Sequence, residues 1–193
     1  MKKKNNFTMV EILLALGVCG IGICGIMVLF PIGANANRDA AMETYAANTA
    51  DQMLHMLKYQ VTTGTATSWT GKIGDSGSLP SANPANDGTN KDIKPDDAGW
   101  SSTAETEMNT IFAHSAAGIY QIISDRGSGS PSLTSDKVDF RAIMFVWWSD
   151  IDLLGAGHDD IGATLNVEVT WPAALPYPSR QKAHYALEVF NPN

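Results

Sequence analysis

Residues 7–34 of this 193-residue chain read FTMVEILLALGVCGIGICGIMVLFPIGA, and this stretch decides the architecture. From Ile12 to Ala34 no side chain is charged. A helix rises about 1.5 Å per residue, so a run of this length crosses the ~30 Å hydrocarbon layer of a bilayer. Lysines occupy positions 2–4, ahead of the run. Because basic residues favour the cytoplasmic side, the sequence predicts a single membrane span with a cytoplasmic amino terminus and an exported remainder.

Glu11 is a carboxylate at the very start of this apolar run. An ionised side chain in lipid is costly, and it is usually paired or functional. Phe7 lies four residues earlier on the same helix face. If the chain were cut between Asn6 and Phe7, the new ammonium of Phe7 could satisfy Glu11, either in the same subunit or in a neighbour. The alternative is a glutamate whose side chain simply reaches the headgroups.

Residues 4–16, KNNFTMVEILLAL, resemble the prepilin amino-terminal motif of type IV pilins and type II secretion pseudopilins. In that family a prepilin peptidase cuts before the phenylalanine and methylates its new amine, and the glutamate guides subunit docking. The resemblance implies a leader peptide of residues 1–6, cleavage between Asn6 and Phe7, a methylated Phe7, and an assembly role for Glu11. The residue before the cut is normally glycine in the family, whereas it is Asn6 here.

Shorter stretches further along resemble the PilV-type minor pilins and related minor pseudopilins; they are residues 21–23, 37–40 and 50–54. The resemblance implies a pilin-like fold and a structural subunit of a type IV pilus, a secretion pseudopilus or a DNA-uptake filament. It also implies four partners: prepilin peptidase, other pilin or pseudopilin subunits, an inner-membrane assembly platform and membrane lipid. The expected location is the bacterial inner membrane, followed by a pilus or a periplasmic pseudopilus.

A rival interpretation is an exported monomeric binding protein or enzyme. Ala34-Asn35-Ala36 has the small-x-small form of a secretory cleavage site. Such a protein would be released by cleavage after Ala36, or would keep the helix as a simple anchor. The apolar run is longer than the ~7–15 residues usual for a signal peptide, which favours the membrane span.

From residue 35 to residue 60 the apolarity becomes one-sided. Apolar and small residues recur at the spacings of three and four that are typical of an amphipathic helix. They are Met42, Ala46, Thr49, Met53 and Met56. We therefore expect one long helix, with a transmembrane half over 7–34 and an amphipathic half over 35–60. Pro31 removes one hydrogen bond from the helix and predicts a kink there.

Residues 61–193 are predicted to form an exported α+β domain. Its first part, 61–101, is rich in Thr, Ser, Gly, Asn and Asp and predicts a long surface loop. Ser102 and Glu105 have capping-box spacing, which predicts a short helix ending near Gly118. The apolar face of that helix would comprise Met108, Ile111, Phe112 and Ala116.

Four strand-like runs follow, over residues 119–124, 138–148, 164–171 and 183–190. The third and fourth alternate apolar with polar residues, the period of a half-buried strand. The second is apolar on both sides and should be central and covered. Residues 172–182, with three prolines, are predicted to be a connecting loop. The sequence thus predicts an antiparallel sheet with one face on the long helix.

One loop gathers carboxylates that could bind calcium through oxygen ligands. The candidates are Asp150, Asp152, Asp159 and Asp160, with His158 among them. The spacing fails the EF-hand pattern, because Leu154 and Ile161 occupy ligand positions. A solvated acidic turn is therefore the main interpretation, and calcium is the secondary one.

The rest of the chain offers little chemistry. No nucleophile motif, phosphate loop or metal spacing is present, so we expect a protein that is not an enzyme and has no cofactor. Acidic residues number 20 against 13 basic ones, a net charge of -7. Nucleic-acid binding needs a basic surface, so the sequence carries no direct signal for it.

Overall fold

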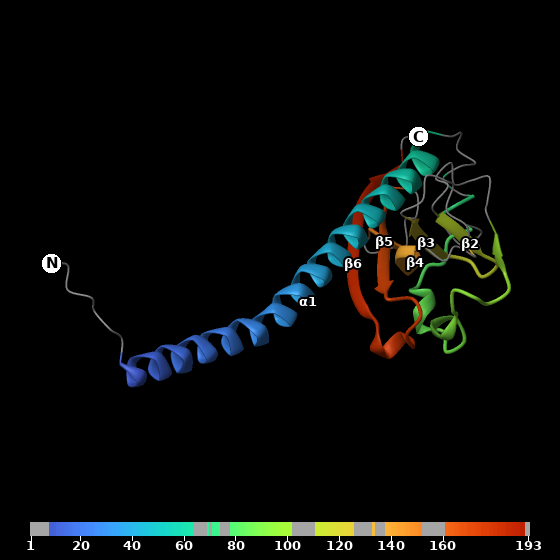
Figure 1. Cartoon of the computed structure of the whole chain (residues 1–193). Coiled ribbons are helices and arrows are strands. Elements are labelled where there is room, and N and C mark those ends of the chain that lie inside the picture. Colours follow the sequence, from blue (N-terminus) through green and yellow to red (C-terminus); the bar gives the residue numbers. More distant parts are fainter. Residues whose placement is uncertain are drawn as a thin grey trace. The chain divides into compact units, whose positions relative to one another are not determined.

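The computed structural model describes residues 8–63, 69, 71–73, 78–101, 111–125, 133, 138–151 and 161–191. The chain forms two compact units, Met1–Met42 and Glu43–Asn193. A single helix, α1 (Met9–Thr62), contributes to both of them (Figure 1). The long helix expected from the sequence is therefore confirmed, and it ends two residues beyond the predicted boundary.

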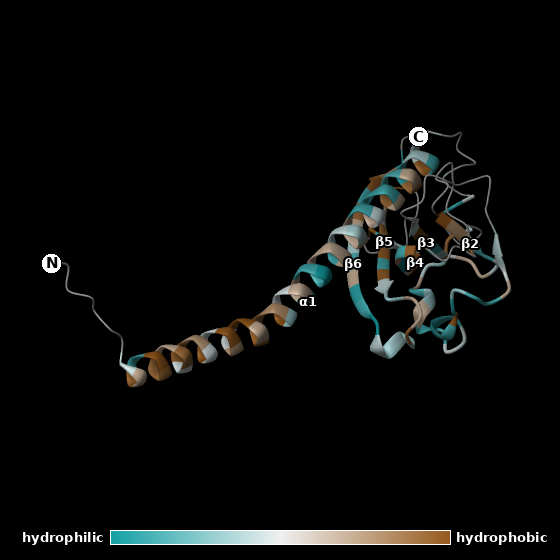
Figure 2. Cartoon of the chain, viewed as in Figure 1, coloured by the Kyte–Doolittle hydropathy of each residue, from teal (hydrophilic) through white to brown (hydrophobic). Residues whose placement is uncertain are grey.

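In the first unit α1 exposes its apolar side chains. Ile21, Met27 and Phe30 are 77%, 68% and 77% exposed. Figure 2 shows the ribbon of this part of the helix coloured mostly brown, the hydrophobic end of the scale, with paler bands between. It is the one helix in the described part of the chain that is long and apolar enough to cross a membrane. Pro31 lies inside the helix, which continues through it, and the kink expected there stays a prediction.

The second unit is built on a six-stranded antiparallel sheet in which each strand pairs with the next along the chain. The strands are β1 (Trp100–Ser101), β2 (Ile111–His114), β3 (Ile119–Asp125), β4 (Val138–Asp150), β5 (Gly162–Trp171) and β6 (Gln181–Phe190). The four strands expected from the sequence are confirmed as β3 to β6. The α+β class is confirmed with them. β4 lies between β3 and β5 and is buried along most of its length, as its two-sided apolarity predicted.

The carboxyl-terminal part of α1 supplies the helical side of the core. Its buried residues are Ala46, Thr49, Ala50, Met53, Leu54, Leu57 and Val61. Three of these were predicted from the helical spacing, whereas the predicted Met42 and Met56 are half-buried. Tyr45 stacks on Phe140 of β4, with 5.7 Å between ring centroids. Each large apolar side chain buried in this way contributes about 1.5–3 kcal/mol relative to exposure.

The opposite face of the sheet is also covered along β4, as the two-sided apolarity of this strand predicted, but the segment that covers it was not predicted. A cluster on that face joins Ala85, Ile119, Ile143, Phe145 and Ala173. Residues 78–101, expected to be a surface loop, contribute Ala85 from the 3-10 turn η1 (Pro84–Asn86), and Ile93 and Trp100 pack against the cluster. A second 3-10 turn, η2 (Asn90–Asp92), buries none of its residues. As a result the polar Asn166 and Thr170 of β5 are buried as well.

The short helix predicted to end near Gly118 is wrong for its described residues. Ile111–His114 form strand β2, which pairs with β3. Gly118, with a positive φ of 72°, makes the turn between the two strands, and any Cβ there would collide with the carbonyl of Val146. The apolar residues at 111 and 112 match a strand as well as a helix, and pairing with β3 decides between them. Residues 102–110, including the predicted capping box, lie outside the described residues.

Candidate functional site

The carboxylate of Glu11 closes a reciprocal capping box with Thr8 at the start of α1. The backbone N–H and the hydroxyl of Thr8 each donate to Oε2 of Glu11 at 2.9 Å. The N–H of Glu11 approaches Oγ1 of Thr8 at 3.4 Å in return. Such a box satisfies amide groups that the first turn of a helix leaves unpaired. The role of Thr8 was missed from the sequence, although Thr8-x-x-Glu11 carries its signal.

This box leaves the second carboxylate oxygen available. Oε1 of Glu11 has no hydrogen-bond partner among the described residues. Its neighbours on the helix are apolar and exposed, with Ile12 at 51% and Leu16 at 64%. Asn6 and Phe7, the predicted cleavage site, lie outside the described residues. Glu11 therefore presents one acceptor oxygen at the start of an apolar stretch of α1.

The candidate calcium loop is described only at its first carboxylate. Asp150 is the last residue of β4, opposite Ala163 of β5, and its Oδ1 is buried without a hydrogen-bond partner. Asp152, Asp159 and Asp160, together with His158, lie outside the described residues. Among the residues that the structure does describe, no three potential metal ligands come together. The calcium hypothesis stays an untested prediction.

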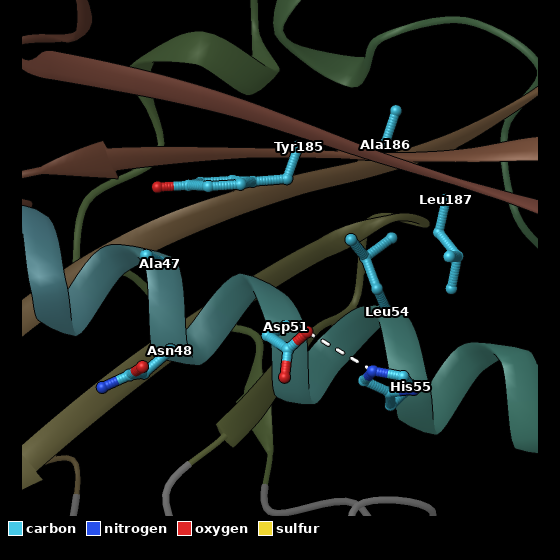
Figure 3. A pocket seen from close by; sticks show the side chains of 8 residues that line it. All are labelled: Ala47, Asn48, Asp51, Leu54, His55, Tyr185, Ala186 and Leu187. Carbon is cyan, nitrogen blue, oxygen red and sulfur yellow. Dashed lines mark ion pairs between the residues drawn. The ribbon is translucent and has the colours of Figure 1, made fainter.

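A groove of about 440 Å³ lies between α1 and β6 within the second unit. Its helical wall is formed by Ala47, Asn48, Asp51, Leu54 and His55, and its sheet wall by Tyr185, Ala186 and Leu187. Figure 3 shows both walls and the ion pair between Asp51 and His55, at 3.4 Å. The groove was missed from the sequence, because its two walls are more than a hundred positions apart in the chain and neither carries a motif.

A polar network ties the outer loops to β5. Glu168 accepts hydrogen bonds from the Tyr177 hydroxyl at 2.7 Å and from Asn83 Nδ2 at 3.1 Å. The ammonium of Lys182 lies 3.5 Å from the centre of the Tyr177 ring. Burial and then the hydrogen bond to the Glu168 carboxylate raise the pKa of Tyr177 to about 12. The network holds the loops on the sheet.

Arg180 is the one buried basic residue in the described part of the chain. Its guanidinium donates to the carbonyls of Leu175 at 2.7 Å and Ile93 at 3.2 Å, and to the hydroxyl of Thr170 at 3.4 Å. Burial lowers its pKa, and the Asp92 carboxylate opposes this effect. Because it bonds to two loops and to β5, Arg180 is a structural clamp.

Comparison with known proteins identifies no relative: no family model, no curated protein and no solved structure matches this chain.

Proposed function

We propose that this chain is a minor pilin or minor pseudopilin, a non-enzymatic subunit of a type IV pilus or type II secretion filament. The observation that carries the proposal is the single carboxylate of Glu11 at the edge of an uncharged run, four residues after Phe7. The likeness of residues 4–16 to the prepilin motif supports it. A long helix that leads into an antiparallel α+β unit is the architecture that such a subunit needs.

Assembly of such a subunit is a packing reaction. The exposed apolar helix of the first unit leaves lipid and enters a bundle of like helices. Lipid tails are as apolar as these side chains, so the exchange is driven by close packing and by polar contacts between helices. The glycines at positions 17, 20, 22 and 25 have open space around their Cα atoms, which permits close approach of a neighbouring helix.

Glu11 supplies the polar contact that sets the register. Thr8 occupies Oε2, and Oε1 can accept a hydrogen bond from the ammonium of a neighbour's Phe7. A charge-assisted bond of this kind is about twice as strong as a neutral one. In a subunit placed one turn out of register, the Glu11 carboxylate would have no partner and would be surrounded by apolar helices, which is costly.

Three substitutions at one position test this mechanism in cells that assemble the filament. Glu11→Gln keeps an oxygen for the capping box but removes the charge, whereas Glu11→Ala removes both and Glu11→Asp keeps the charge on a shorter arm. We expect all three variants to insert in the membrane. The Gln and Ala variants should be lost from the sheared filament fraction, by about tenfold or more for an interaction worth 1.4 kcal/mol or above. Wild-type incorporation of Glu11→Gln would contradict the role of the charge.

A further inference from the structure

Strand β6 forms a long free edge of the sheet. It pairs with β5 over ten residues in unbroken register, from Gly162 opposite Phe190 to Trp171 opposite Gln181. It is the last strand in the sheet order, so no described strand pairs with its other side. Proteins usually protect such an edge with a bulge, a proline, charged side chains or a very short strand. β6 carries the charged Lys182 and Glu188, but it contains no proline and no bulge, and at ~3.4 Å per residue its length is about 34 Å.

The ladder shows which backbone groups face outward. The N–H of Asn191 donates to the carbonyl of Ile161, so the odd-numbered residues of β6 bond to β5. In an antiparallel ladder the alternate residues point the other way. The outward N–H and C=O groups therefore belong to Lys182, His184, Ala186, Glu188 and Phe190, whose side chains are all exposed on the face away from α1.

The groove begins where this edge meets the helix. Tyr185 and Leu187 point from β6 toward α1 and form its floor, with Leu54 beside them (Figure 3). A strand added to β6 would send every second side chain into this space. Those side chains would meet an apolar floor and, beyond it, the Asp51 carboxylate, whose side chain is 73% exposed.

Charge indicates which side chains fit. Residues 43–193 carry 18 acidic and 9 basic side chains, a balance of -9. At the groove itself Asp51 is the acidic residue, and Glu43 acts on Tyr185, whose pKa burial raises first and the Glu43 charge raises further. Lysine and arginine lay a long aliphatic stem on apolar surface and keep the charged end in water. In this groove the aliphatic stem would lie on the apolar floor, and the charged end would reach the Asp51 carboxylate.

We infer that the β6 edge and its groove bind an extended polypeptide segment that carries lysine or arginine at alternate positions. The segment adds a seventh strand through main-chain hydrogen bonds to Lys182, His184, Ala186 and Glu188. Its basic side chains enter the groove and end at Asp51, and the residues between them lie beside Ala186 on the other face. This inference goes beyond the filament proposal and does not rest on it, because the groove lies wholly within the second unit.

Fluorescence anisotropy of the full chain in nanodiscs tests this binding. The probe is a labelled octapeptide that alternates valine with lysine, blocked at both ends. Paired residues of neighbouring strands send their side chains to the same face, so the residues that bond to β6 are those facing away from the groove. If lysines fill the groove, the valine amides make the hydrogen bonds. N-methylation of the valine amides should then weaken binding about tenfold or more, while N-methylation of the lysine amides leaves it unchanged.

Two substitutions in the protein, with one control, test the contact between the peptide and the β6 edge. Ala186→Pro removes an outward N–H and costs no bond to β5, and it should weaken binding about tenfold. Asp51→Asn should weaken it about threefold, the scale of an exposed ion pair. Asp96→Asn is the matched control, since it removes the same charge from a residue outside the groove and should have no effect. Circular dichroism of each variant verifies that the fold is kept.

The outcomes separate strand addition from simple attraction between opposite charges. The inference is overturned if both patterns of N-methylation weaken binding of the peptide equally. It is also overturned if neither pattern weakens binding. Greater weakening by methylated lysine amides overturns it too, because lysine would then face away from the groove. Equal losses in Asp51→Asn and Asp96→Asn, or the absence of saturable binding, also contradict it.

Discussion

The two parts of α1 belong to one helix and have opposite surroundings. Between residues 43 and 62 a face of the helix is buried against the sheet, and Met53 is fully inaccessible. From Met9 to Ile32 the large apolar residues are at least half exposed, and the 18-residue stretch that best fits a membrane span is not buried at all. Burial inside the second unit contributes to folding, whereas the apolar surface of the first unit needs lipid or a partner helix. One continuous helix thus contains a segment that stabilises the fold of the second unit and a segment whose apolar surface stays exposed.

The sharpest contrast comes from the same substitution at two methionines. Met53→Ala leaves a cavity in the core and should lower the free energy of unfolding of the second unit by about 2–4 kcal/mol. Met27→Ala, at a side chain that is 68% exposed, should change it by less than about 0.5 kcal/mol. All five tryptophans follow residue 43, so their fluorescence during denaturant unfolding of the detergent-solubilised chain reports on this unit. Equal losses at both positions would remove the distinction between the two segments.

A second pair of variants extends the contrast to charged residues. Arg180→Ala leaves the carbonyls of Leu175 and Ile93 without their donor and should cost about 2–3 kcal/mol. Arg38→Ala removes the same charge from a side chain that is 69% exposed and should cost nothing measurable. The same unfolding experiment compares them. If Arg180→Ala proves as stable as Arg38→Ala, Arg180 does not act as a structural clamp on the outer face of the sheet.

The smallest expected effect is a pH dependence at Tyr177. Its pKa in the folded protein is raised to about 12, against about 10 for an unfolded tyrosine. The stabilisation is therefore fully present below pH ~10 and decreases as the pH rises from ~10 toward 12, because the unfolded chain releases this proton first. We expect less than about 1 kcal/mol, since the ring is partly solvated. Denaturant unfolding at a series of pH values should show this decrease in the wild type and a shallower one in Tyr177→Phe, which keeps the ring under Lys182; identical slopes would contradict it.

The sequence predicted those elements whose signal lies within a short stretch of chain. The uncharged run from Ile12 to Ala34 predicts a helix with an apolar surface. The alternation of apolar and polar residues in β5 and β6 predicts strands with one buried face. β2 was missed because the apolar pair Ile111–Phe112 is too short to distinguish a strand from a helix. The segment forms a strand because it pairs with β3.

What the sequence could not show depends on contacts between distant positions. The cover over the outer sheet face joins Ala85 to Phe145 and Ala173, and the polar loop that carries Ala85 shows no periodicity. The groove likewise needs α1 and β6 to lie side by side. At the amino terminus the position of Glu11 in an apolar run predicted a paired carboxylate, whereas its hydrogen bonds from Thr8, three residues away, were not predicted.

The mass of the mature amino terminus tests the central claim most directly. The chain should be purified from the membrane and from sheared filaments of cells that express it, and its amino-terminal peptide analysed by mass spectrometry. The account predicts a chain that begins at Phe7 and carries one methyl group on its amine, so that the ammonium lies within reach of a neighbour's Glu11. A chain that begins at Asn37, after cleavage behind Ala36, or one that keeps residues 1–6, would contradict it.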